Sequence, residues 1–230
     1  MQKDFKAFEE TLGITFNNSK LLRQAFIHRS YLNEHRSETA EHNERLEFLG
    51  DAVLELIATH FLFEKFPTHS EGDLTAFRAS LVNFVTLGEV ATEIGMNDYL
   101  LLSRGESKDT GRARGVLLAN AIEALVGAIY LDQGYDAAKA FIEKHLFPKL
   151  DKIIKDKSWR DAKSVLQERA QETEGSTPYY SVINETGPDH DKQFVIGVYV
   201  KDTLLAKGQG KSKQEGEQDA ARNALEAKGW

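Results

Sequence analysis

The sequence predicts two domains: a mainly α-helical domain over the first 150 residues and a small α+β domain from residue 160 onward. Two observations predict this division. Up to about Leu150, apolar residues recur at three- and four-residue steps, the spacing of helices with one buried face, and only Pro67 and Pro148 interrupt the pattern. Beyond residue 160 the spacing changes, and stretches rich in β-branched and aromatic residues indicate strands.

The C-terminal domain is expected to have the element order α-β-β-β-α. Its expected helices cover residues 163–171 and 214–228, and its expected strands cover residues 179–183, 194–200 and 203–208. This order forms a small antiparallel sheet with both helices on one face. A charged stretch separates the domains, so the predicted boundaries are 1–150 for the helical domain, 151–159 for a linker and 160–230 for the α+β domain.

The composition is that of a globular protein. Of the 230 residues, 41% are hydrophobic and 28% are charged, which argues against a disordered or fibrous chain. The absence of cysteine excludes a disulfide scaffold, a thiolate zinc site and a cysteine nucleophile, and it fits a reducing compartment. The first residues lack the apolar stretch of a secretory signal, and the charge-poor stretch 116–131 is too short and too polar to span a bilayer. We therefore expect a soluble, cytoplasmic protein without a membrane partner.

The charge balance limits how nucleic acid could bind. The formal net charge is −7, and residues 160–230 taken alone are slightly acidic as well. Phosphate binding relies on Lys and Arg, so any nucleic-acid surface must be a local basic patch with modest salt sensitivity.

Three carboxylates are expected to line one face of the helix that contains residues 43–54. At about 100° per residue, Glu44, Glu47 and Asp51 fall within about 60° of one another. The opposite side gathers the expected core residues, which are Leu46, Leu49, Val53, Leu56 and Ile57. Taken alone, this pattern also describes an ordinary solvated helix face, because like charges at this spacing cost only about 0.2–0.5 kcal/mol per pair.

Phe48 favours a second role for this face. It points to the acidic side of the helix, away from the expected core stripe. A large aromatic residue there is either incidentally exposed or in contact with another surface. We expect a subunit interface close to the carboxylates.

Glu123 is the only charged residue between positions 116 and 131, and Asn120 lies one helical turn before it. A carboxylate in apolar surroundings is unfavourable unless it is protonated or meets a cation. No Lys or Arg stands three or four residues away to pair with it. One interpretation is a partly exposed Glu at a helix edge. The other is that Glu123 and Asn120 face the three carboxylates across a helix pair and share a divalent cation, for which oxygen ligands favour Mg²⁺ or Mn²⁺ over zinc.

These segments together resemble bacterial ribonuclease III. The specific element is NERLEFLGDAVL at 43–54, and the flanking pieces are AFIHRS at 25–30, EGD at 71–73, RASLV at 78–82 and NAIEAL at 120–125. The C-terminal α-β-β-β-α segment resembles the double-stranded-RNA-binding domain of that family. The resemblance covers essentially the whole chain in the right order.

The resemblance implies a homodimeric, Mg²⁺-dependent endonuclease that cuts double-stranded RNA, with Mn²⁺ as a substitute metal. Products in this family carry 5′-phosphate and 3′-hydroxyl ends with short 3′ overhangs. The implied roles are processing of ribosomal RNA precursors and of some messenger and transfer RNA precursors, and some members process CRISPR-associated RNA. The rival hypothesis is a non-catalytic double-stranded-RNA-binding regulator whose helical domain only dimerises.

By position, the resemblance implies a metal-binding cluster made of Glu47, Asp51, Asn120 and Glu123. Asp51 and Glu123 match the residues usually assigned to catalysis, with Glu47 in the same cluster and Glu44 in a supporting role. Glu71 matches another acidic residue near the cleft, and Phe48 matches an aromatic residue that inserts into the partner subunit.

Two further residues of the helical domain need separate interpretation. The family most often has Asp where this chain has Asn120, so we expect weaker metal affinity with activity retained, because an amide oxygen brings no charge. His28 is expected to be a structural histidine that caps or bridges helices rather than a general base.

Three elements of the C-terminal domain are candidates for contact with A-form RNA, which proteins recognise mainly by its shape. They are the polar face of the first helix, a turn between strands, and the start of the last helix, whose N-terminal amides attract phosphate. Their candidate residues are Ser164, Gln167, Glu168 and Gln171, then His190, then Lys211, Ser212 and Lys213. The family usually has two adjacent basic residues where this chain has Lys213 and Gln214. Without the resemblance, all of these would be interpreted as ordinary surface residues.

Overall fold

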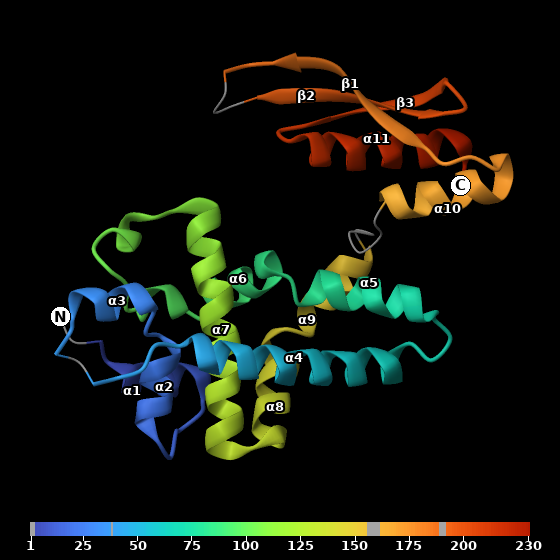
Figure 1. Cartoon of the computed structure of the whole chain (residues 1–230). Helices are drawn as coiled ribbons and strands as arrows, with labels where there is room; N and C mark the ends of the chain where they lie inside the picture. The colour runs from blue at the N-terminus through green and yellow to red at the C-terminus, as the bar shows by residue number, and fades with distance from the viewer. Residues whose placement is uncertain (1–2, 38, 156–161, 189–191) are drawn as a thin grey trace. The chain divides into compact units, whose positions relative to one another are not determined.

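The computed structural model describes residues 3–37, 39–155, 162–188 and 192–230 (Figure 1). The chain divides into two compact units, Met1–Trp159 and Arg160–Trp230. The first is helical and the second is α+β, as the sequence predicts.

The first unit consists of helices joined by loops, the longest of which runs from residue 94 to residue 110. They are α1 (Phe5–Leu12), α2 (Ser19–Ala25), α3 (Arg29–Glu34), α4 (Glu44–Lys65), α5 (Glu71–Leu81), α6 (Phe84–Glu93), α7 (Gly111–Gln133), α8 (Tyr135–His145) and α9 (Pro148–Lys155), with the 3₁₀ turns η1 (Met96–Asp98) and η2 (Glu106–Lys108). Polar side chains fix several helix starts by accepting hydrogen bonds from the first free backbone amides, among them Asp4, Asn18, Ser70 and Asn83.

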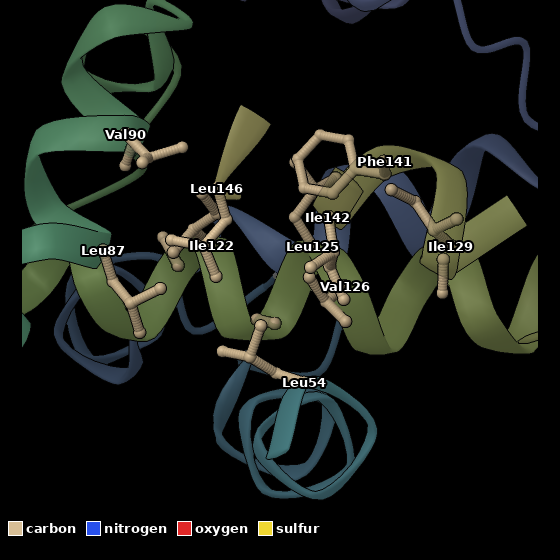
Figure 2. Packing of buried hydrophobic residues seen from close by; sticks show 14 of the residues in the cluster. Leu54, Leu87, Val90, Ile122, Leu125, Val126, Ile129, Phe141, Ile142 and Leu146 are labelled. Atoms are coloured by element: carbon tan, nitrogen blue, oxygen red, sulfur yellow. The ribbon is translucent and has the colours of Figure 1, made fainter. Parts of the chain in front are cut away.

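The longest helix, α7, is the centre of the first unit. Figure 2 shows how its apolar residues pack against Leu54 of α4, Leu87 and Val90 of α6, and Phe141 of α8. At 23 residues α7 is longer than the stretch 116–131 considered above, and by length and composition alone it could cross a membrane. Its burial among the neighbouring helices accounts for that composition, since a core helix is apolar on most sides.

Helix α4 presents its core face slightly differently from the prediction. Leu46, Val53 and Ile57 are buried as predicted, and Leu49 is half-buried. Leu56 is 59% exposed, so its assignment to the core is wrong. The buried stripe is turned toward Leu54, which packs against α7, and this rotation leaves Leu56 on the outer surface.

The predicted linker begins too early. Residues 151–155 belong to α9, and Ile153 is buried in the core of the first unit. The charges of this segment misled the prediction, because they lie on the outer face of an amphipathic helix. Residues 156–161 lie outside the part of the chain that the structure describes.

The second unit has the predicted order: α10 (Ala162–Glu174), β1 (Tyr179–Thr186), β2 (Gln193–Val200), β3 (Thr203–Gly210) and α11 (Lys213–Lys228). The sheet is antiparallel in the order β1-β2-β3. Alternate residues of β2, among them Ile196 and Val198, are buried beneath the helices, with Leu166 of α10 and Ala220 of α11 in the same core. The unit is therefore a single sheet with its helices on one face (Figure 1).

Candidate functional site

Helices α4 and α7 cross in backbone contact, and the crossing lies among the predicted site residues. Gly50 of α4 stands against the backbone of Glu123 and Gly127 on α7. Glu47 and Asp51 flank Gly50 in the sequence, while Asn120 lies one turn before Glu123. The fold therefore brings the two predicted groups of oxygen ligands to one place.

The ionisation of Glu123 shows how close these groups are. Burial, with smaller contributions from the negative charges of Asp51, Glu47 and Glu55, raises the pKa of Glu123 to about 7. Burial also raises the pKa of Glu47, with smaller contributions from the charges of Glu44 and Asp51. Carboxylates from the two helices thus act on one another directly, as an acidic cluster.

Glu55 is a member of this environment that the sequence analysis missed. It lies four residues after Asp51, so it continues the row of carboxylates along α4. Its side chain forms an ion pair with Arg78 of α5 at 2.9 Å. The four-residue spacing between Asp51 and Glu55 would have been enough to predict its place in this row.

The charges of the acidic cluster are compensated unequally. Glu44, at the rim, lies 3.5 Å from Arg29 and 3.8 Å from His42. Among the described residues, no Lys, Arg or His forms an ion pair with Glu47, Asp51 or Glu123. Glu47 and Glu123 are half-buried, and Asp51 is exposed. Partly buried negative charge without a counter-charge fits a bound cation.

The donor set fits a hard divalent cation. Glu47, Asp51 and Glu123 offer carboxylate oxygens, and Asn120 is half-buried on the same helix as Glu123 and offers an amide oxygen. Within the described residues, no three Asp, Glu or His side chains already converge on one point as a preformed metal site would.

Other residues singled out in the first unit have clear structural positions. His28 caps α3, because its Nδ1 accepts a hydrogen bond from the Ser30 amide, and it also lies 2.7 Å from the Glu106 carboxylate. Its prediction as a structural histidine is confirmed. Glu71 begins α5 and accepts a hydrogen bond from the Thr75 hydroxyl at 3.1 Å, and it is not among the carboxylates that raise the pKa of Glu123.

An exposed apolar stripe runs along α4 beside the acidic cluster. Phe48 is 81% exposed, as its position away from the core predicted, and Leu56 and Phe63 are 59% and 69% exposed. The sequence analysis missed Phe63 and misassigned Leu56. Their spacing of seven or eight residues, two helical turns each, is the signal that joins them to Phe48.

In the second unit, the described RNA-binding candidates are all at the surface. Ser164, Gln167, Glu168 and Gln171 are exposed along α10. Lys211 and Lys213 are exposed at the start of α11, where neither forms an ion pair with a described residue. Ser212 is the N-cap of α11 and accepts a hydrogen bond from the Glu215 amide at 3.1 Å. His190 lies outside the described residues.

Comparison with known families accounts for both units. Residues 18–150 match the model of the Ribonuclease-III-like family, and residues 162–228 match the double-stranded RNA binding motif. The chain belongs to the ribonuclease III family.

The similarity of the chain to individual ribonuclease III proteins supports this family assignment. The chain is 46% identical to ribonuclease 3 of Bdellovibrio bacteriovorus over 224 residues, which is 97% of this chain and 95% of the relative. It is 48% identical to ribonuclease 3 of Geobacillus kaustophilus over 222 residues, covering 96% and 90%. The solved nuclease domain of Campylobacter jejuni ribonuclease III superposes with a TM-score of 0.57 at 36% identity, covering 63% of this chain and 99% of that one.

Membership of the ribonuclease III family makes the chain an endoribonuclease with a double-stranded-RNA-binding domain. This confirms the predicted family, fold class and enzyme class, and it decides against the non-catalytic regulator. Nucleases of this family are generally metal-dependent, which agrees with the charge and the donor atoms of the acidic cluster.

Proposed function

We propose that this ribonuclease III is a Mg²⁺-dependent endonuclease, with Mn²⁺ as a substitute, that hydrolyses double-stranded RNA to 5′-phosphate and 3′-hydroxyl ends with short 3′ overhangs. The observation that carries the proposal is the acidic cluster at the α4–α7 crossing, where burial, together with the charges of Asp51, Glu47 and Glu55, raises the pKa of Glu123 to about 7. A group poised near neutral pH among like charges is typical of functional sites.

In the proposed mechanism, Glu47, Asp51 and Glu123 hold the cation through carboxylate oxygens, and Asn120 adds a neutral oxygen. When bound, Mg²⁺ lowers the pKa of the attacking water and neutralises charge on the scissile phosphate. Glu123 must lose its proton to act as a ligand, and its pKa of about 7 means that this proton leaves readily at neutral pH. Without a cation, the same carboxylates would repel the phosphate backbone.

The second unit would hold the duplex. Exposed hydroxyl, amide and carboxylate groups on α10 suit the 2′-hydroxyls of a shallow minor groove. Lys211 and Lys213 stand where the free amides and dipole of α11 also attract phosphate. His190 completes the proposed RNA-binding set.

The exposed stripe on α4 supports a homodimer. Phe48, Leu56 and Phe63 would leave a row of large apolar groups in water on a lone subunit, which is typical of an interaction surface. Light scattering on Phe48→Ala tests this: we expect its dimer to dissociate at a higher protein concentration than that of the wild type. Unchanged dissociation would remove Phe48 from the interface.

The proposed substrates are ribosomal RNA precursors and some messenger, transfer and CRISPR-associated RNA precursors. Because these transcripts are made in the cytoplasm of a bacterium, we propose that compartment for the protein. The absence of cysteine fits its reducing conditions.

Incubating the purified full chain with a perfect RNA duplex tests the proposed function. We expect cleavage with Mg²⁺, none with EDTA, and products that carry 5′-phosphate and 3′-hydroxyl ends. A single-stranded RNA of the same sequence is the substrate control. Cleavage that persists in EDTA, or that acts equally on the single strand, would contradict the proposal.

A further inference from the structure

The contact between α4 and α7 is closer than an ordinary helix pair allows. A Cβ atom at Gly50 would lie 1.8 Å from the carbonyl oxygen of Glu123 and 2.8 Å from the amide nitrogen of Gly127. A Cβ atom at Gly127 would lie 2.3 Å from the carbonyl oxygen of Leu46 and 3.1 Å from the amide nitrogen of Gly50. The obstructing atoms belong to the backbone, so no side-chain rotation relieves the clash. Each helix therefore needs a glycine here so that the other can approach.

The close contact between Gly50 and Gly127 lies next to the predicted metal ligands in the sequence. Gly50 comes three residues after Glu47 and directly before Asp51 in the sequence, and the carbonyl that it faces belongs to Glu123 itself. Gly127 lies one turn beyond Glu123 on α7. The point of closest approach therefore lies within one helical turn of Glu47 and Asp51 on α4 and of Glu123 on α7.

Magnesium is demanding about distance. It takes oxygen ligands at about 2.0–2.1 Å in near-octahedral geometry, whereas helix pairs in general are separated by about 8–10 Å. Side chains of fixed length on two helices reach one ion only if the helices hold the right separation. A shift of about 1 Å is enough to weaken such a site.

We infer that Gly127, with Gly50 opposite, is a positioning residue for the acidic cluster: the two missing side chains set the separation at which groups on α4 and α7 reach one divalent cation. The inference rests on the proposed Mg²⁺ dependence. Gly127 touches neither the substrate nor the cation, and it acts through the placement of Glu123.

Gly127→Ala tests the inference, and Gly88→Ala is its matched control. A Cβ atom at Gly88 of α6 would lie 2.9 Å from the carbonyl oxygen of Gly115, two turns before Glu123 on the same helix. The control therefore adds the same methyl group against the α7 backbone, but between α6 and α7 instead of at the α4–α7 crossing.

Two readouts separate positioning from a general loss of stability. The first is Mg²⁺ binding to the RNA-free protein by calorimetry, and the second is the Mg²⁺ dependence of single-turnover duplex cleavage. For Gly127→Ala we expect the Mg²⁺ concentration at half-saturation to rise at least about tenfold in both, because displaced supporting residues weaken metal sites to this extent. For Gly88→Ala we expect it to stay within about twofold of the wild type. Duplex binding without divalent cations should be unchanged in both variants.

A folded Gly127→Ala with wild-type Mg²⁺ dependence would overturn the inference, and so would an equal rise in Gly88→Ala. If Gly127→Ala does not fold, the same Mg²⁺ measurements on Leu54→Phe test the inference. Leu54 packs between α4 and α7 one turn beyond Gly50, against Ile122 and Val126. Its enlargement should raise the Mg²⁺ requirement at least about threefold, and an unchanged requirement in that folded variant would overturn the inference. A wild-type protein that neither binds nor requires Mg²⁺ would instead refute the proposed function.

Discussion

Glu123 on α7 and Lys213 on α11 carry opposite charges in opposite surroundings. Glu123 is half-buried among other carboxylates, and its pKa is raised to about 7. Lys213 is exposed at the start of a helix and forms no ion pair with a described residue. The comparison separates two uses of charge: the first unit concentrates like charges where a cation is needed for chemistry, and the second leaves a cation in water where it only attracts phosphate.

The largest expected effect is on duplex cleavage when the half-buried Glu123 is substituted. Glu123→Gln keeps the shape of the side chain but removes a charged ligand, so we expect duplex cleavage to fall by at least about 10³-fold. Duplex binding, measured by gel shift in EDTA, should stay within about twofold. Glu10→Gln, the same change at an exposed position on α1, is the control. Normal cleavage by Glu123→Gln would remove Glu123 from the catalytic set.

Asn120→Asp is expected to strengthen the same cluster. The added charge should lower the Mg²⁺ concentration at half-saturation by roughly tenfold at pH 8, because a carboxylate binds Mg²⁺ better than an amide. Calorimetry without RNA and cleavage rates both measure it. Asn97→Asp, an exposed position in η1, is the matched control. Identical Mg²⁺ dependence in Asn120→Asp and the wild type would refute the expectation.

Substitution of the exposed lysine, Lys213→Ala, should weaken duplex binding modestly. One phosphate contact is lost, so the slope of log affinity against log salt should fall by about 1, with affinity reduced roughly threefold to tenfold. Lys201→Ala, an exposed lysine in the turn between β2 and β3, should change neither quantity. If both variants lose affinity equally, the start of α11 is not a specific phosphate site.

The smallest expected effect concerns stability against pH. Glu123 has a pKa of about 7 in the folded chain against a model value of 4.5, so between these values the folded state keeps a proton that the unfolded state loses. The metal-free protein therefore loses stability as pH rises from about 4.5 to 7. Glu123→Gln escapes this loss. We expect the free energy of unfolding of Glu123→Gln to exceed that of the wild type by about 1 kcal/mol at pH 8, a value reduced to allow for the partial exposure of Glu123. At pH 4 the two free energies should be equal.

Urea unfolding in EDTA measures this difference. Glu10→Gln should match the wild type at both pH values. A Glu123→Gln protein that is no more stable at pH 8 than the wild type would show that burial and the carboxylates of α4 do not raise the pKa of Glu123 in solution.

Much of this molecule followed from sequence patterns. Helical spacing placed Glu44, Glu47 and Asp51 on one face of α4, and the isolation of Glu123 in an apolar stretch indicated that its carboxylate needs a proton or a cation unless it is partly exposed at a helix edge. Spacing did not show which way the core stripe of α4 faces, because that depends on how α7 packs, so Leu56 was misassigned. The contact at Gly127 was missed because it depends on the approach of a second helix, whereas Glu55 was missed although its spacing from Asp51 was visible in the sequence.

The linker was predicted to begin too early because a short amphipathic helix with many charged residues resembles a linker in sequence. The polar residues of 151–155 suggested a linker, yet a single buried side chain, Ile153, ties that segment to the first core. Ser212 was considered only as an RNA contact, and its hydroxyl also fixes the start of α11.

The anchoring of Ile153 has a practical consequence for dissecting the enzyme. The family match of the nuclease unit ends at residue 150, but α9 continues to Lys155. A nuclease fragment truncated at the family boundary would lose residues 151–155, most of α9, and open a gap in its own interior, whereas a fragment that retains Lys155 keeps that interior closed.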